Sequence, residues 1–553
     1  MTPRVPLPAL RFGFAFRLPT AVAIAGLMLL TQLGSSNSHA ADSKQLHVIV
    51  LAGQSNMEGQ AVVDLDGKDY NEGRGTLVSF LRSPAQAARF HGLRNSKGAW
   101  TTLENVFIRY QRENAPLLKG RLGIGYSVYG DAHHFGPELQ LGHVLGNGLG
   151  EPVLLIKTAW GGKSLYQDFR PPSSGNTGPY YLRMIAEIRE ALARLPQDFP
   201  SLANAKPVLS GFVWYQGWND GVDPKHAIPE YETNLVNLIQ DVRREFQSPA
   251  LPVVIGELTG PWVDAPAEWA ALRRAQAAAA NRSDFQGNVV FVPTHDFVRR
   301  AEDSPNPSHG HHEFGNAETY LRVGDALGHG LLGLIHSRPA GEGYETRRLL
   351  GWTVHLKLDL LKEQPEEVKA MWPLLEQQLR EIIRTVPQPA LQRLQEVPFW
   401  FTLPPSKTGG HAEYHPGADW LRENGRDPAM VKGVQVSDVR DFGKETIRMP
   451  CFMLHELSHG YHDRVLGFDH PEVRAAFEAA RDGKGYDRVE RWLGNGRPNT
   501  FERAYAMTNP QEYFAECTEA FFGRNDFFPF TREELKRHDP KMDALLERLW
   551  MQR

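Results

Sequence analysis

Two histidines and a glutamate in the segment "HELSH" have the spacing that metal-assisted hydrolysis requires. His455 and His459 lie four residues apart and Glu456 follows the first of them. On a helix the two imidazoles share one face, where they can bind a single zinc ion, Zn²⁺, and the glutamate can take a proton from the attacking water. The alternative interpretation is a buried helix that happens to contain paired histidines.

A catalytic zinc ion needs a third protein ligand, and a later segment offers carboxylates. In "TNPQEYFAECTEAFFG", Glu512, Glu516 and Glu519 recur at helical spacing, and many of the residues between them are aromatic or small. Carboxylates on a helix whose other faces are apolar need partners, and a metal ion is the strongest partner. The two segments together predict a zinc site.

A serine follows an apolar run in "LHVIVLAGQSNMEG". Gly53 and Gly59 allow a tight strand-to-helix turn that presents the Ser55 hydroxyl. The helix that begins there directs free amides and its positive dipole end at the same position. A hydroxyl nucleophile also needs a base and oxyanion donors from elsewhere in the chain. Ser55 as a simple helix cap is the alternative interpretation.

The elements around this serine alternate between strand-like and helix-like patterns. Five runs rich in Val and Ile predict buried parallel strands, and they begin at Leu46, Pro152, Leu209, Leu251 and Asn288. Helical patterns lie between or after them. This alternation predicts an α/β fold, a three-layer α/β/α sandwich with a parallel sheet, over residues 41–335. Residues 62–150 are less regular and are expected to form loops over the carboxyl edge of the sheet.

The pattern changes after a polar segment rich in Pro and Gly, residues 336–345, which is typical of a linker. Long helical stretches with charged and Leu-rich faces dominate the rest of the chain, and strand-like pieces such as residues 431–438 are isolated. This pattern predicts a mainly helical α+β domain over residues 346–553.

Four segments of the first half resemble the four blocks of the SGNH hydrolases, in particular the sialate O-acetylesterase and acetylxylan esterase branch. They are "GQSNMEG", "TAWGGKSL", "VWYQGWND" and "HHEFGNAETY". The resemblance implies that Ser55 is the nucleophile and that Gly162 and Asn219, with the Ser55 amide, form the oxyanion hole. Alignment on "NAETY" implies His312, rather than His311, as the base.

The fourth block departs from the family pattern. Relatives usually carry an aspartate three residues before the histidine base, where this chain has His309. Glu302, Asp303 or Asp220 could orient His312 instead, or a backbone carbonyl could do so in a catalytic dyad. Removal of the acid lowers the rate of a triad without abolishing catalysis. A surface metal-binding cluster is another interpretation of "HGHH".

"HELSH" and "NPQEYFAE" together resemble the gluzincin zinc metallopeptidases, in particular the catalytic domain of anthrax lethal factor and its bacterial relatives. The resemblance implies that His455, His459 and Glu512 are the zinc ligands. It implies that Glu456 is the general base. It also implies that Tyr505 steadies the tetrahedral intermediate and that Glu516 orients a ligand histidine. The substrate is expected to pair with an edge strand, for which residues 431–438 are the candidate.

The N-terminal residues have the order of a secretory signal, with arginines first, then the apolar run "AVAIAGLMLL", then small residues up to Ala40. Residues 1–40 are therefore predicted to be a signal peptide, which implies a secreted, periplasmic or cell-surface protein without stable membrane insertion. An uncleaved anchor is the alternative. The net charge of −4, without a long run of either sign, argues against nucleic-acid binding.

The chain contains two cysteines, Cys451 and Cys517, which are either one disulfide beside the predicted zinc site or two small buried residues. The leading hypothesis is an exported hydrolase with two active sites, acting on an acetylated carbohydrate and on a peptide or protein. One alternative keeps a single site active. Another is a glycan-binding surface protein whose aromatic residues stack on sugars without turnover.

Overall fold

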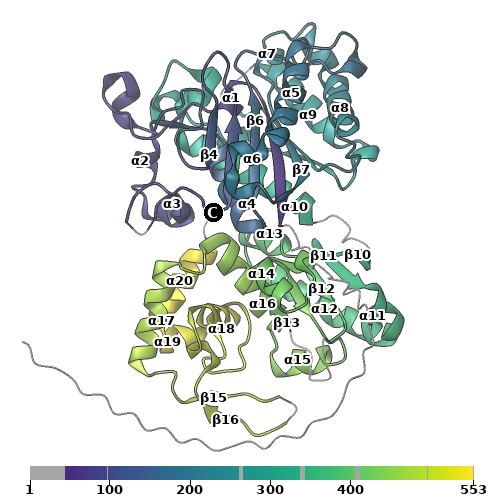
Figure 1. Cartoon of the computed structure of the whole chain (residues 1–553). Helices are drawn as coiled ribbons and strands as arrows, with labels where there is room; N and C mark the ends of the chain where they lie inside the picture. The colour runs from purple at the N-terminus through teal and green to yellow at the C-terminus, as the bar shows by residue number, and fades with distance from the viewer. Residues whose placement is uncertain are drawn as a thin grey trace, which may run out of the picture. The chain divides into compact units, whose positions relative to one another are not determined.

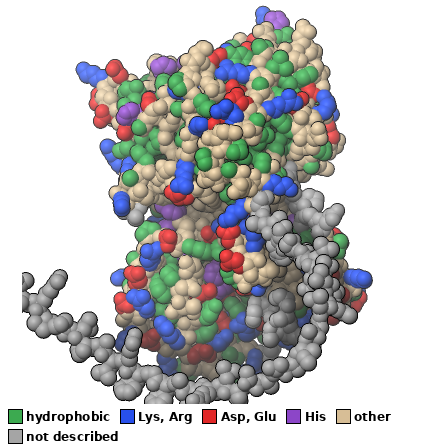
Figure 2. Space-filling view, in the orientation of Figure 1, with side chains coloured by type: hydrophobic (Ala, Val, Ile, Leu, Met, Phe, Trp, Pro, Cys, Tyr) green, Lys and Arg blue, Asp and Glu red, His purple; other side chains and the backbone are tan. Residues whose placement is uncertain are grey.

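A computed structural model describes residues 44–95, 97–260, 266–336, 343–404, 412–494 and 496–551. The predicted signal peptide lies outside these residues, as do residues 337–342 of the predicted linker. Within the described ranges, no helix combines the length and the apolar composition that crossing a membrane requires. On the face seen in Figure 2, acidic and basic side chains are interspersed rather than gathered into one patch of either sign.

The apolar runs of the first half form a seven-stranded sheet with the order β4-β3-β6-β1-β7-β8-β9. Its central strand β1 (Gln45–Gly53) pairs in parallel with β6 (Val153–Ala159) and β7 (Lys206–Tyr215). The parallel pairing continues to β8 (Val253–Gly256) and β9 (Val289–Val292). These parallel pairs confirm the predicted parallel sheet. Its strands are apolar on both faces because both faces of the sheet are covered.

Helices cover the sheet on its two faces (Figure 1). Alternate residues of β1 belong to two separate hydrophobic cores, so the strand packs on both sides. One core includes α5 (Pro179–Ala193), α8 (Ala227–Glu245) and α9 (Ala267–Ala280). The other includes α4 (Glu138–Gly148) and α10 (Ala317–His336). The predicted α/β fold is therefore observed in the first half of the chain.

Residues 62–150 are not only loops, so that expectation was wrong. β3 (Val106–Tyr110) lies beside β6 in parallel, and β4 (Leu118–Arg121) pairs with β3 in antiparallel orientation at the edge of the sheet. Arg109 interrupts the apolar pattern of β3, yet it is buried because Glu187 and Asp198 neutralise it at 3.1 and 3.2 Å.

A second sheet of five strands lies in the other half, with the order β10-β11-β12-β14-β13. The strands are β10 (Tyr344–Leu349), β11 (Trp352–Lys357), β12 (Phe399–Phe401), β13 (Ala412–Tyr414) and β14 (Val434–Val436). β14 pairs with β12 on one side and β13 on the other. Residues 431–438 therefore do not form an edge strand as expected, because β13 covers that side and is itself the edge.

Helices and one hydrophobic core surround this second sheet. The longest are α12 (Pro365–Thr385), α16 (Phe452–Tyr461), α17 (Pro471–Gly483), α18 (Pro510–Phe522) and α20 (Pro540–Trp550). The shorter ones are α11 (Leu358–Glu363), α13 (Ala390–Gln395), α14 (Ala418–Glu423), α15 (Phe442–Arg448) and α19 (Arg532–His538). Cys451 and Cys517 are free thiols, so the structure does not contain the disulfide considered above.

Candidate active sites

Ser55 begins α1 (Ser55–Glu58) directly after the carboxyl end of β1. The turn depends on glycine at two positions. A Cβ at Gly53 would lie 2.1 Å from the Tyr215 carbonyl oxygen, and one at Gly59 would lie 2.4 Å from the Gly136 Cα. Gly59 also has a φ of 96°, which L side chains rarely adopt. Backbone approach from β7 and from residue 136 therefore fixes the position of the serine.

The loops after β6 and β7 meet the serine turn. A Cβ at Gly161 would lie 3.7 Å from the Ser55 Cβ. The next residue, Gly162, accepts a hydrogen bond through its carbonyl oxygen from Asn219 Nδ2 at 3.0 Å. Gln54 Nε2 in turn donates to Asn219 Oδ1 at 3.0 Å. The structure thus brings together Ser55, Gly162 and Asn219, which the sequence predicted to share one site.

His312 lies in the short helical segment η8 (Gly310–Gly315), immediately before α10. Burial, assisted by His311 and His309, lowers the pKa of His312 to about 4, so the ring is neutral at pH 7. Within the described residues, the His312 ring and the Ser55 hydroxyl form no direct hydrogen bond. The residues that follow Ser55 and His312 join α1 to η8: Asn56 Nδ2 donates a hydrogen bond to Glu313 Oε1 at 3.1 Å.

The acids proposed to orient His312 have other partners. Both oxygens of the Asp220 carboxylate accept backbone hydrogen bonds, from Leu165 at 2.8 Å and from Tyr166 at 2.9 Å, so Asp220 fixes the loop after β6. Burial raises the pKa of Asp220 to about 6. Glu302 lies 3.5 Å from Arg300. In the described part of the chain, neither these two acids nor Asp303 hydrogen-bonds the His312 ring.

Glu313 is a site residue that the sequence reasoning missed. Its side chain is buried, its Oε1 also accepts from the Gly260 amide at 2.9 Å, and its Oε2 has no hydrogen-bond partner among the described residues. Burial raises the pKa of Glu313 to about 8. Its φ of 51° is left-handed, a conformation that is costly outside glycine. The one available signal was an acid directly after the predicted base histidine, in a segment of mostly polar residues and glycine.

The predicted metal ligands converge where α16 packs on α18. His455 Nε2 and His459 Nε2 lie 3.2 Å apart. Glu512 Oε2 lies 3.2 Å from the first of these nitrogens and 3.4 Å from the second. A tetrahedral zinc ion bound at its usual distances separates its ligand atoms by about 3.3–3.5 Å, so the three donors fit such an ion.

The orientation of the first histidine differs in one detail from the expectation. His455 Nδ1 lies 2.7 Å from Glu519 Oε1 but 3.9 Å from Glu516 Oε1. Glu519 is therefore the hydrogen-bond acceptor that fixes this ring, and the assignment of that role to Glu516 was wrong. Glu516 instead accepts a hydrogen bond from Asn525 Nδ2 at 3.1 Å. The two glutamates are three residues apart, so spacing alone did not distinguish them.

Glu456 lies at the edge of the second sheet. Its Oε2 accepts a hydrogen bond from the Tyr414 amide of β13 at 3.0 Å, and burial raises the pKa of its carboxyl group. Tyr505 is half exposed and begins the turn η11 (Tyr505–Met507) before α18. Both residues line a cavity of about 800 Å³ together with the three donors and β13. The structure thus brings all five predicted residues of this site together.

Comparison with known proteins bears on the first site. A family model described as a carbohydrate esterase, sialic acid-specific acetylesterase, matches residues 45–321, just over half of the chain. That range contains Ser55, Gly162, Asn219 and His312. A search of the curated proteins finds no match.

Three solved structures are similar to the chain at low identity. A protein from Arabidopsis thaliana is 17% identical with a TM-score of 0.33, over 52% of this chain and 98% of that one. A carbohydrate acetylesterase from Xanthomonas citri is 14% identical with a TM-score of 0.30, over 55% and 59%. The protein NanS is 13% identical with a TM-score of 0.28, over 46% and 78%.

Proposed function

The chain belongs to the sialic acid-specific acetylesterase family of carbohydrate esterases, and we propose that its first half removes O-acetyl groups from a carbohydrate with Ser55 as the nucleophile. The observation that carries the proposal is the family match over residues 45–321. The approach of Gly161 to Ser55 and the bond between Asn56 and Glu313 support it, because they join three of the matching blocks.

The chemistry follows from the protonation state of His312. At neutral pH its ring carries no charge, because burial lowers its pKa. It can therefore accept the Ser55 proton as Oγ bonds to the ester carbonyl carbon. The Ser55 amide, the Gly162 amide and Asn219 Nδ2 would donate to the resulting oxyanion. His312 returns the proton to the departing sugar hydroxyl, and water then releases acetate from Ser55 by the same route.

The test is release of acetate from O-acetylated sialic acid and from acetylated xylo-oligosaccharides, with p-nitrophenyl acetate as a general substrate. Ser55→Ala should remove turnover of every substrate that the wild type hydrolyses. Ser201→Ala, at an exposed serine, is the matched control and should match the wild type. Equal rates for wild type and Ser55→Ala would contradict the proposal and favour a glycan-binding role.

A second function is favoured by the fit of the three donors to a tetrahedral ion. We propose that His455, His459 and Glu512 bind zinc and that the second half hydrolyses peptide bonds. Zinc bound there would polarise the substrate carbonyl and make water more acidic. Glu456, held by the Tyr414 amide, would accept the proton of the attacking water and deliver it to the leaving amine. Tyr505 would donate to the tetrahedral intermediate, and an extended substrate would pair with β13, the edge strand of the sheet in the described residues.

This second proposal is tested by metal analysis and by cleavage of a peptide library. The wild type should carry about one zinc ion per chain and Glu512→Ala much less. Glu456→Gln should keep the zinc but lose peptide cleavage, which separates metal binding from proton transfer. A wild type without zinc would contradict the zinc site, and a zinc-loaded chain that cleaves no peptide would contradict the activity. The predicted export is a separate proposal, tested by fractionation of cells that express the full chain.

A further inference from the structure

The side chain of Gln54 joins the segment of the proposed nucleophile to the predicted oxyanion donor. Gln54 directly precedes Ser55 in the turn after β1, and its side chain is buried. Its amide group contacts the segment that follows β7, where α7 (Trp218–Gly221) begins and carries Asn219. The orientation of this buried amide decides which atom of the Asn219 side chain faces which neighbour.

Backbone groups fix the orientation of the Gln54 amide. One of its two polar atoms faces the Gly217 amide at 3.2 Å and the Asn219 amide at 3.3 Å. A backbone N–H can only donate, so this atom is the oxygen Oε1 and the other is the nitrogen Nε2. Gln216 Nε2 donates to the same oxygen at 3.2 Å, and this nitrogen is identified in turn because it also donates to the Lys163 carbonyl at 3.0 Å. Three donors therefore agree on one orientation.

The opposite end of this chain of contacts is also a backbone group. Asn219 Nδ2 lies 3.0 Å from the Gly162 carbonyl oxygen, which can only accept. Gln54 Nε2, which can only donate, lies 3.0 Å from Asn219 Oδ1. A flipped Asn219 amide would place nitrogen against nitrogen and oxygen against oxygen, and it would lose both hydrogen bonds. Gln54 and Gly162 therefore permit one orientation of the Asn219 side chain.

This orientation is the one that stabilisation of an oxyanion requires. Asn219 Nδ2 carries two hydrogens, of which the Gly162 carbonyl accepts one, so the second is available to a substrate oxygen. Asn219 is partly exposed, whereas Gln54 is buried. Asn219 can therefore contact a bound ester, and Gln54 can act on the reaction only through Asn219.

We propose that Gln54 is a positioning residue for ester hydrolysis, because it holds the Asn219 amide with its nitrogen toward the oxyanion hole. The inference rests on the proposed esterase function of the first half. A donor that is already oriented stabilises the developing oxyanion without reorganisation, and loss of one such donor lowers kcat by about 100–1,000-fold.

The first experiment compares the wild type with Gln54→Glu, which has nearly the same shape. The carboxylate still accepts from the Gly217 and Asn219 amides but cannot donate, so the Asn219 amide should turn its nitrogen toward residue 54. The kcat for p-nitrophenyl acetate should fall about 100-fold with little change in KM. Gln286→Glu, at an exposed position, adds the same charge and should match the wild type.

A double-mutant cycle separates positioning from a merely structural role. Asn219→Ala removes the donor and should itself lower kcat. In that background Gln54→Glu should lower kcat by less than about threefold more, because no amide is left to orient. The same loss of about 100-fold in both backgrounds would overturn the proposal, since Gln54 would then act independently of Asn219.

A neutron structure of the deuterated wild type tests the orientation without variants, because neutrons locate hydrogen positions that X-rays at ordinary resolution do not. Deuterium on the Asn219 atom that faces Gly162 supports the proposal, and deuterium on the atom that faces Gln54 overturns it. The activity of the wild type is measured separately. A wild type that hydrolyses no acetyl ester would contradict the proposed esterase function, whereas an active wild type with the opposite Asn219 orientation would contradict this inference alone.

Discussion

At the scale of single residues, Glu313 joins the turn after β1 to the segment that carries His312. The carboxyl group is buried and its pKa is raised to about 8, so it is protonated over much of the neutral range. The unfolded chain ionises near the ordinary value of 4.5. Glu313 therefore contributes full stability below about pH 4.5, and this contribution is lost as the pH rises toward 8.

Glu313→Gln keeps an acceptor for Asn56 and Gly260 but cannot ionise. We expect the wild type to lose stability relative to this variant by about 1.4 kcal/mol per pH unit between pH 4.5 and 8. Urea unfolding of both proteins at several pH values measures the difference. Glu268→Gln, at an exposed position of α9, is the control. A difference between wild type and Glu313→Gln that does not change with pH would contradict the assignment.

A second prediction at this scale concerns His312. Its pKa of about 4 keeps the base form available well below the ordinary value of 6.5. The kcat/KM for acetyl ester hydrolysis should therefore stay flat from pH 7 to about pH 5 and fall near pH 4. His309→Asp restores an acid three residues before the base, and it should move the acidic limb of the kcat/KM profile, the fall near pH 4, to higher pH. A limb near 6.5 in the wild type would show that His312 is not the titrating base.

At the scale of elements, α16 and α18 supply the donors of the second site from two helices that contact each other. The orientation of His455 depends on an acceptor one helical turn after Glu516 and two turns after Glu512. Glu519 is fully buried on α18, and it accepts at 2.7 Å from His455 Nδ1. Such acceptors fix the tautomer and the orientation of a ligand ring.

Glu519→Gln should therefore reduce zinc affinity by about 10–100-fold, while leaving all three ligands in place. Competition with a fluorescent zinc chelator measures the change. Glu516→Gln is the matched control from the same helix, and it should have the smaller effect because its carboxylate lies 3.9 Å from the same nitrogen. Equal losses in the two variants, or a larger loss in Glu516→Gln, would contradict the role of Glu519.

The strands that carry the first site and the helix face that carries the zinc donors could be predicted from the sequence. β1 and β6 were predicted because buried parallel strands have continuous apolar sequences. The shared face of α16 was predicted because residues four apart, as in "HELSH", lie on one side of a helix. β3 was missed because buried Arg109 breaks its pattern, and its neutralising acids lie about eighty residues away. Glu313 was missed, and the role of Glu519 was assigned to Glu516, because both roles depend on contacts with distant segments.

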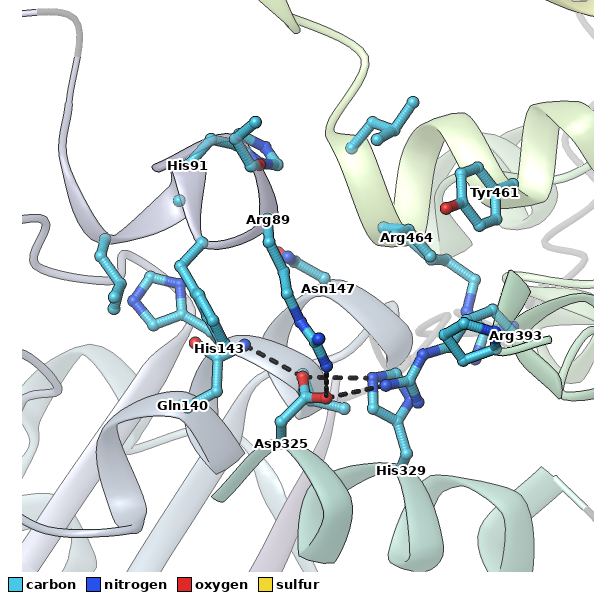
Figure 3. Close-up of a pocket in the computed structure, with 18 of the residues that line it drawn as sticks. Arg89, His91, Gln140, His143, Asn147, Asp325, His329, Arg393, Tyr461 and Arg464 are labelled. Atoms are coloured by element: carbon cyan, nitrogen blue, oxygen red, sulfur yellow. Dashed lines mark hydrogen bonds and ion pairs between the residues drawn. The ribbon is translucent and has the colours of Figure 1, made fainter. Parts of the chain in front are cut away.

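At the scale of the whole molecule, Glu396 ties both halves of the chain together. It follows α13, and its carboxylate lies 2.8 Å from His329 Nδ1 of α10 and 3.2 Å from Arg464 Nη2 of η10 (His462–Leu466). α10 begins shortly after His312, and η10 continues the helix that carries His459. α10 of the first half and η10 of the second half, which carry His329 and Arg464 in Figure 3, therefore both contact the same buried carboxylate.

Glu396→Gln removes that charge and leaves Arg393 and Arg464 in the interior without it. Breaking a buried pair costs about 3–5 kcal/mol, and we expect a loss of that size in urea unfolding at pH 7. Burial alone would raise the pKa of Glu396, but His329 and Arg393 depress it, so its contribution is present above about pH 4.5 and is lost as the pH falls toward 2. Glu423→Gln, at an exposed position, is the control.

If Glu396 couples the halves, acetyl ester hydrolysis and zinc binding should disappear at one urea concentration in the wild type. Two well-separated midpoints in the wild type would show that the halves unfold independently.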